Sequence, residues 1–233
     1  MNLATRPGVT QSVWVMTPPS APVASVILFA GGSGVLGSGR QTVLHSNNFL
    51  IRSREKFAAA GFLVASVDAP SDHPEGLDAF RSSAEHAADI AAVIGYLRQR
   101  APVPVWLIGT SKGTISAANA AARLKSGGAD GLVLTSSMAV QTRRAAPIDA
   151  SVDVAAITLP TLFVHNKDDA CPACAFGAVP ALMERFVNAR KKALIAVSGG
   201  STPESEPCEA LSRHGYLGIE DEVVGDIVRW IKG

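Results

Sequence analysis

Residues 103–125 read VPVWLIGTSKGTISAANAAARLK, in which an apolar run, a glycine-flanked serine and an alanine-rich run follow one another. The apolar run Val103–Ile108 is typical of a buried strand, and Lys112–Lys125 is typical of a helix that ends before a glycine pair. Between them, GTSKG (Gly109–Gly113) matches G-x-S-x-G, the pattern of a serine on a tight turn from strand to helix. Such a turn exposes the hydroxyl at the end of the sheet, and the N-terminus of the following helix stabilises negative charge there. Ser111 is therefore a candidate nucleophile.

Outside this segment, apolar runs alternate with stretches of helical periodicity. The pattern predicts strands at residues 13–16, 25–30, 62–68, 131–135, 161–165 and 193–197, and helices at residues 49–60, 82–100, 179–189 and 219–231. The last predicted helix has acidic residues in its first turn and basic residues in its last, as the helix dipole favours. This alternation indicates an α/β fold, with a mostly parallel central sheet and helices on both faces. Ligands bind such sheets at the carboxyl ends of the strands, which is where GTSKG lies.

The composition is that of a globular protein, since 47% of the 233 residues are apolar and 18% are charged. It excludes a disordered chain, a collagen and a small disulfide-dense scaffold, and the length favours a single domain over residues 1–233. A formal net charge of +1 without a run of basic residues predicts no nucleic-acid partner. No apolar stretch reaches the roughly 18 residues of a membrane span. Nothing in the sequence indicates the oligomeric state.

Two other glycine-rich patterns point to nucleotides; one fails on its spacing and the other lacks required residues. Gly32–Gly37 (GSGVLG) spells G-x-G-x-x-G after a predicted strand, but Ser38-Gly39-Arg40 extends the loop. Asp68 also comes too late to serve as the ribose-binding acid of a dinucleotide site. The following glycines resemble a phosphate-binding loop, but the required lysine and hydroxyl residue are absent. We therefore expect no nucleotide cofactor.

A serine hydroxyl needs a base and an orienting acid, and on this kind of turn the chain order is serine, acid, histidine. Asp168 and Asp169 follow the strand predicted at residues 161–165. His214 follows the last predicted strand and precedes the last helix, whereas the other histidines lie in early loops, inside a helix or at the end of a strand. The order predicts a triad of Ser111, His214 and one of the two aspartates.

These motifs resemble the α/β-hydrolase superfamily over essentially the whole chain. The strongest match is GTSKG, followed by FAGGSG (Phe29–Gly34), HNKDDAC (His165–Cys171) and RHGYLGIEDEVV (Arg213–Val224), the last being similar to the histidine loop and final helix of small bacterial hydrolases. The family places its acid four residues after the strand-end histidine. The resemblance therefore implies Asp169 as the acid, with Asp168 as the alternative.

The resemblance also implies an oxyanion hole of backbone amides. One donor is the N–H of Lys112, directly after the nucleophile, and the other comes from the loop after residues 25–30. There this chain has Ala30-Gly31 where the family usually has His-Gly, which places Gly32 at the donor position and leaves Ser33 as the alternative. The missing histidine has little effect because the donor is a backbone group.

The implied activity is hydrolysis of carboxylic esters through an acyl-enzyme, without a metal or cofactor. Amide hydrolysis, peptide hydrolysis and acyl transfer use the same triad, and a non-catalytic binding protein on this fold is a further alternative. Family members often carry a lid between the strands predicted at residues 131–135 and 161–165. This chain has only Met138–Leu159 there, so we expect a minimal cap and an open site for short esters or the exposed end of a polymer. Arg143 and Arg144 lie in that segment and are candidates for recognising an anionic substrate, although adjacent loop arginines are usually only solvated.

The three cysteines add one structural expectation. Cys171 lies just after the acid loop and Cys208 in the histidine loop. Adjacent strands bring these loops together, so a Cys171–Cys208 disulfide that leaves Cys174 free is one expectation, and three reduced thiols are the alternative. A zinc or redox role for the pair Cys171 and Cys174 lacks a second ligand pair. Met1–Gly8 lacks the apolar region of a signal peptide, so we expect either a cytoplasmic protein or one whose leader was removed, and a disulfide would favour a periplasmic or secreted protein.

Overall fold

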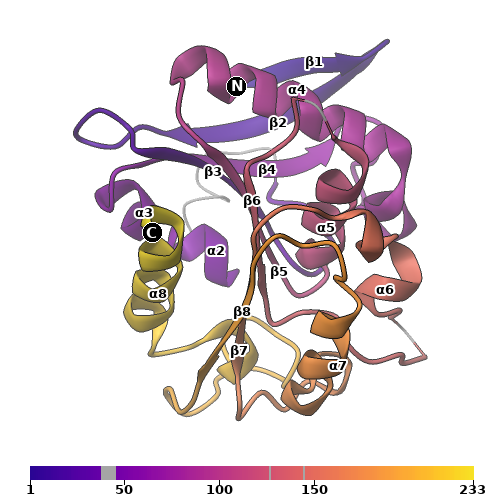
Figure 1. The fold of residues 1–233 in the computed structure, drawn as a ribbon, viewed down its shortest axis with the longest axis vertical. Helices are drawn as coiled ribbons and strands as arrows, with labels where there is room; N and C mark the ends of the chain where they lie inside the picture. Colours follow the sequence, from indigo (N-terminus) through magenta and orange to yellow (C-terminus); the bar gives the residue numbers. More distant parts are fainter. Residues whose placement is uncertain (38–45, 126, 144) are drawn as a thin grey trace.

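A central sheet of eight strands organises the computed structural model, which describes residues 1–37, 46–125, 127–143 and 145–233 (Figure 1). The spatial order is β1-β2-β4-β3-β5-β6-β7-β8. The strands are β1 (Asn2–Arg6), β2 (Val9–Met16), β3 (Ala24–Phe29), β4 (Phe62–Pro70), β5 (Val105–Thr110), β6 (Gly131–Thr135), β7 (Thr161–Asn166) and β8 (Lys192–Val197). β1 and β2 form an antiparallel hairpin, β2 is antiparallel to β4, and all other neighbouring pairs are parallel. The predicted mostly parallel sheet is confirmed.

Helices cover both faces of this sheet. Figure 1 shows α2 (Phe49–Arg52), α3 (Arg54–Ala59) and α8 (Glu220–Lys232) on one side. The other side carries α4 (Ala84–Arg100), α5 (Gly113–Arg123), α6 (Ile148–Ser151) and α7 (Val179–Glu184). Each side has its own apolar core against the sheet. The strands β3, β5, β6 and β7 are buried along their whole length, which is why their sequences are continuous apolar runs rather than alternating ones.

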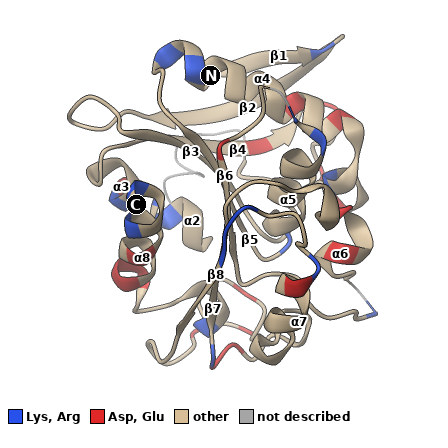
Figure 2. Ribbon diagram, in the orientation of Figure 1, with Lys and Arg blue, Asp and Glu red and all other residues tan. Residues whose placement is uncertain are grey.

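Several predicted elements differ from the observed ones at their ends. The helix predicted at residues 49–60 is interrupted at Ser53, which separates α2 from α3. The helix predicted at residues 179–189 ends at Glu184. The strand β1 was not predicted, because it is a short edge strand that pairs only with β2. In α8 the acidic first turn and basic last turn stand at opposite ends of the helix, as Figure 2 shows.

No large cap covers the carboxyl edge of the sheet in the described part of the chain. Where the structure describes the segment Met138–Leu159, its helical elements are the single-turn helix α6 and a short 3₁₀ turn, Val154–Ala156. The predicted minimal cap is confirmed. Among the described residues, the helices lack the length and apolar character needed to cross a membrane.

Candidate active site

Ser111 lies on a sharp turn between the end of β5 and the start of α5. Its φ is 53°, a left-handed conformation that a non-glycine residue seldom adopts. The backbone N–H of Ser111 donates to the carbonyl oxygen of Thr135 at 3.0 Å, and Thr114 N donates to the carbonyl oxygen of Ser111 at 2.9 Å. These bonds hold the turn between the neighbouring strand β6 and the helix. The strained turn places the half-buried serine at the carboxyl edge of the sheet.

The glycines around Ser111 leave no space for a side chain. A Cβ at Gly113 would lie 2.1 Å from the carbonyl oxygen of Phe29 in β3, and one at Gly109 would lie 2.5 Å from the carbonyl oxygen of Gly113. A Cβ at Gly31 would lie 2.9 Å from the Cβ of Ser111. The pattern G-x-S-x-G is therefore a steric requirement of this turn, because helix α5 and the loop after β3 both approach the serine backbone closely.

The two aspartates after β7 point in different directions. Asp169 is buried, and its Oδ2 lies 2.8 Å from Nδ1 of His214, while its Oδ1 accepts from the N–H of Cys171 at 2.9 Å. Asp168 is exposed; its Oδ2 accepts from the N–H of Gly199 and lies 3.6 Å from Nη1 of Arg213. The structure brings Asp169, not Asp168, to His214.

The loop that carries His214 is fastened to the ends of β6 and β7. The hydroxyl of Ser136 donates to the carbonyl oxygen of His214 at 2.7 Å. The hydroxyl of Tyr216 accepts from the N–H of Ser136 at 3.0 Å and donates to the carbonyl oxygen of Val164 at 2.6 Å. Both Ser136 and Tyr216 have positive φ values, 44° and 59°. Sequence reasoning gave neither residue a role. Ser136 lies outside the motifs, and Tyr216 lies inside RHGYLGIEDEVV, but their meeting depends on the sheet order.

Ser111 and His214 line one cavity of about 260 Å³ at the edge of the sheet. Nε2 of His214 is buried and has no hydrogen-bond partner among the described residues. Because Nδ1 is held by Asp169, Nε2 is the nitrogen left to act on a substrate or on the serine hydroxyl. The geometry leaves this histidine nitrogen available in the cavity that the serine also lines.

Two backbone amides stand beside the serine. Gly32 has a φ of 60°, and a Cβ placed on it would meet no atom within 4 Å, so the backbone borders open space. Within the described residues, the N–H groups of Gly32 and Lys112 donate to no protein acceptor. Both residues line a second cavity of about 500 Å³ next to Ser111, which Ser33, the alternative donor, does not line. Unused amides facing a cavity are the groups that bind an anionic oxygen.

The predicted disulfide is present. Cys171 and Cys208 are joined, and their Cα atoms lie 4.6 Å apart. Cys208 lines both cavities at Ser111, and Cys171 lines the larger one. The rest of the larger cavity is mainly apolar, with Met138, Ala145, Pro172 and Ala173 among its lining residues. Arg143 is exposed at its edge, and Arg144 lies outside the described residues.

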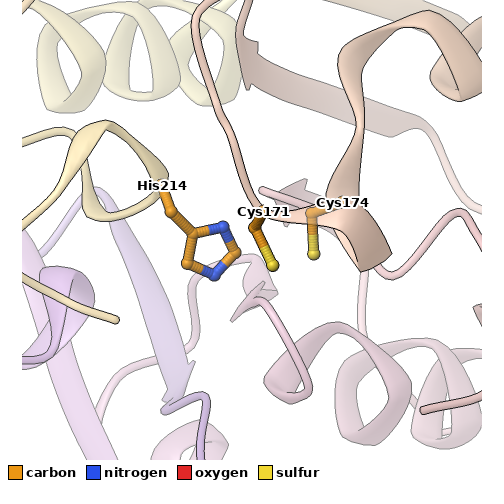
Figure 3. Close-up of side chains that lie close together, drawn as sticks. All are labelled: Cys171, Cys174 and His214. Carbon is orange, nitrogen blue, oxygen red and sulfur yellow. The ribbon is translucent and has the colours of Figure 1, made fainter. Parts of the chain in front are cut away.

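Cys174 lies beside this disulfide and beside the histidine. Potential metal-ligand atoms of Cys171, Cys174 and His214 lie within 4.8 Å of one another (Figure 3). The sulfur of Cys171 is bonded to Cys208, however, so it is not a thiolate ligand while the disulfide is intact. Burial raises the pKa of the Cys174 thiol far above its usual range, and its Sγ contacts Sδ of Met138 at 3.7 Å. In this state Cys174 is a buried neutral thiol.

No protein-family model matches the chain, and no curated protein matches its sequence significantly. Solved bacterial structures match it over nearly its full length. A lidless α/β serine hydrolase from Xanthomonas campestris is 17% identical, with a TM-score of 0.60 over 95% of this chain and 89% of that one. A thermostable carboxyl esterase from Bacillus coagulans is 15% identical, with a TM-score of 0.65 over 100% and 97%. A serine hydrolase homologue from Coxiella burnetii is 16% identical, with a TM-score of 0.64 over 98% and 95%. The chain therefore has the α/β-hydrolase fold, as the sequence motifs predict.

Proposed function

We propose that this protein is a serine hydrolase that cleaves carboxylic esters with the triad Ser111, His214 and Asp169. The observation that carries the proposal is the 2.8 Å contact between His214 Nδ1 and Asp169 Oδ2. It leaves Nε2 available in the cavity that the strained Ser111 also lines. The similarity to solved esterases and serine hydrolases supports the same class.

In the proposed reaction, the hydroxyl oxygen of Ser111 attacks the ester carbonyl carbon while Nε2 of His214 takes the hydroxyl proton. Asp169 accepts the Nδ1–H hydrogen bond, which fixes the ring orientation and stabilises the imidazolium. The negative oxygen of the tetrahedral intermediate accepts hydrogen bonds from the amides of Gly32 and Lys112, each worth about 3 kcal/mol in the transition state. The intermediate collapses, His214 protonates the departing alcohol, and an acyl-enzyme forms. A water activated by His214 then releases the acid. These steps need no metal and no cofactor.

The two cavities on either side of Ser111 suit a small ester. The larger cavity, about 500 Å³ and mostly apolar, accepts one side of the ester, and the smaller cavity beside His214, about 260 Å³, accepts the other. Volumes of this size match a small molecule rather than a folded partner. The absence of a large cap over the described part of the edge also leaves room for the exposed end of a polymeric ester.

Labelling with a fluorophosphonate tests the nucleophile directly. We expect a single adduct on Ser111, identified by peptide mass spectrometry, and hydrolysis of p-nitrophenyl acetate and butyrate. Both signals should disappear in Ser111→Ala. They should persist in the control Ser20→Ala, which removes an exposed serine distant from Ser111 in the sequence. Another outcome is that Ser111 is labelled and p-nitroanilides are hydrolysed, but no ester in a panel is. That outcome would replace the esterase proposal with an amidase proposal. A protein that is neither labelled nor able to hydrolyse esters or anilides would contradict the enzyme proposal. That outcome would favour a binding protein.

A further inference from the structure

An arginine without a carboxylate partner is buried beside the proposed oxyanion hole. Arg81 belongs to a short 3₁₀ helix, Asp78–Ser82, and is 1% exposed. Within the described residues it forms no ion pair. Burial lowers the pKa of Arg81 to about 10 although the Asp78 carboxylate, beyond ion-pair distance, acts in the opposite direction, and the guanidinium stays charged at neutral pH. A buried, unpaired cation is costly, and an apolar side chain of similar size would fill the space at less cost. Its presence therefore calls for a role beyond packing.

The hydrogen bonds of Arg81 go to the backbone on both sides of one peptide group. Its Nη2 donates to the carbonyl oxygen of Ala30 at 3.3 Å and to that of Gly32 at 3.2 Å. The N–H of Gly32 belongs to the peptide that lies between these two carbonyls. A single guanidinium nitrogen thus restrains the loop before and after the proposed donor.

The other end of the same guanidinium reaches the helix that follows the nucleophile. Nη1 of Arg81 donates to Oγ of Ser116 in α5 at 2.9 Å. The short helix makes a second contact with this side of the site, because Oδ1 of Asp78 lies 3.3 Å from Nζ of Lys112. Arg81 and Asp78 therefore connect the loop that carries the Gly32 amide with the turn that carries the Lys112 amide.

The packing around the guanidinium is too tight for a larger neighbour. A Cβ at Gly34 would lie 2.6 Å from Nη2 of Arg81 and 2.6 Å from Cδ1 of Leu77. Leu77 in turn donates its N–H to the carbonyl oxygen of Ser33 at 2.9 Å. The loop after β3 is closed around the arginine, so the guanidinium has a fixed position relative to both amides.

We propose that Arg81 is a positioning residue that holds the amides of Gly32 and Lys112 at the separation needed to bind the oxyanion. The inference rests on the proposed function, since it concerns the transition state of that reaction. Arg81 does not touch the substrate; it acts through the loop carbonyls and Ser116. Amides held in place before the reaction stabilise the developing charge without reorganisation. An enzyme without this restraint should still bind the neutral ester but should stabilise the tetrahedral intermediate less.

The test compares Arg81→Met and Arg81→Lys with the matched control Arg54→Met, measured on p-nitrophenyl butyrate. Arg54 is also buried and donates to a carbonyl, that of Ile51, but lies in α3. For Arg81→Met we expect kcat to fall about 10- to 100-fold with KM changed less than about threefold. Lysine keeps the charge but lacks the planar fork that reaches several acceptors, so Arg81→Lys should lie between methionine and wild type. Arg54→Met should keep kcat within about twofold of wild type.

Inhibition by phenylboronic acid separates positioning from a general structural effect. The boronate adduct of a serine is tetrahedral and mimics the intermediate, so its Ki should rise in Arg81→Met in proportion to the fall in kcat, while KM stays nearly constant. Active sites are counted by fluorophosphonate titration, so that unfolded protein does not enter kcat. If Arg81→Met fails to fold, Ser116→Ala removes only the contact to α5 and should lower kcat severalfold. Unchanged kcat and Ki in the variants that fold, with an active wild type, would overturn the inference. An inert wild type would instead contradict the proposed function itself.

Discussion

The disulfide between Cys171 and Cys208 should contribute strongly to stability, and its removal is a quantitative test of the structure. The bond joins residues 37 positions apart, and the enclosed segment includes β8 and the start of the histidine loop. A cross-link of that length lowers the conformational entropy of the unfolded chain, which raises the free energy of the unfolded state by about 4 kcal/mol. The double variant Cys171→Ser, Cys208→Ser should therefore lower the free energy of unfolding by about 4 kcal/mol.

Urea unfolding followed by tryptophan fluorescence measures this change. With a slope of about 2–3 kcal/mol/M, the midpoint should fall by about 1.3–2 M. The control is Cys174→Ser, which removes the thiol that does not take part in the bond and should shift the midpoint far less. Thiol titration of the untreated protein in denaturant should find one free thiol. Three free thiols, or a midpoint that does not respond to the double variant, would refute the reasoning.

The bond should also matter for activity, because it joins the two loops that meet at the proposed acid and base. The N–H of Cys171 donates to Oδ1 of Asp169, and Cys208 precedes His214 by a few residues and lines both cavities. We expect reduction to lower ester hydrolysis at temperatures where the reduced protein is still folded. Equal activity of the reduced and oxidised protein would show that the loops hold their positions without the bond.

Three further predictions concern the acid, a glycine and a buried histidine. Asp169→Asn should lower kcat about a thousandfold or more, whereas Asp168→Asn, whose carboxylate contacts a loop amide and an arginine, should stay within about fivefold of wild type in the same ester assay. Gly113→Ala, whose Cβ would lie 2.1 Å from a carbonyl oxygen of β3, should destabilise the protein by about 3 kcal/mol in urea unfolding. Gly177→Ala, with nothing within 4 Å of its Cβ, should change stability by less than about 0.5 kcal/mol, and equal effects at the two glycines would contradict the packing argument. Burial lowers the pKa of His86 from 6.5 to about 3 in the folded protein. Between pH 3 and 6.5 the imidazole is therefore protonated in the unfolded chain and neutral in the folded one. The free energy of unfolding should therefore fall as the pH drops from 6.5 toward 3, by about 1.4 kcal/mol per pH unit from this group. This part of the pH dependence should disappear in His86→Phe.

The alternation of strands and helices could be predicted because each element leaves a local signal. The strands β3, β5, β6 and β7 are buried on both faces, so their sequences are uninterrupted apolar runs bounded by glycine, proline or polar residues. The strand β1 left no such signal. It is held by contacts with distant residues, among them the 2.9 Å bond between Nε of Arg6 and Oδ1 of Asp89 in α4.

The candidate site divides in the same way. Ser111 was predictable because its turn requires glycines within two residues on each side, and that steric requirement is visible in the sequence itself. The chain order alone left Asp168 and Asp169 open, because the two residues are adjacent, and the family resemblance favoured Asp169. In the structure the loop conformation directs Asp169 to His214 and Asp168 to Gly199. The predicted role of His214 remains a proposal, as do the roles of Gly32 and Lys112.

The amino-acid sequence by itself determined the α/β class, the turn at Ser111 and the order of the candidate triad, because apolar periodicity, glycine sterics and chain order act over a few residues or along the chain. Only the tertiary structure showed how the loop after β7 turns Asp169 toward His214, and how Ser136 and Tyr216 hold the loop of His214. It also showed that Arg81 is buried against the loop after β3. These contacts join residues dozens of positions apart, such as Arg81 with Ala30 and Tyr216 with Ser136. Their hydrogen bonds become worth forming only when the sheet brings the loops together and excludes water, so no local pattern in the sequence records them.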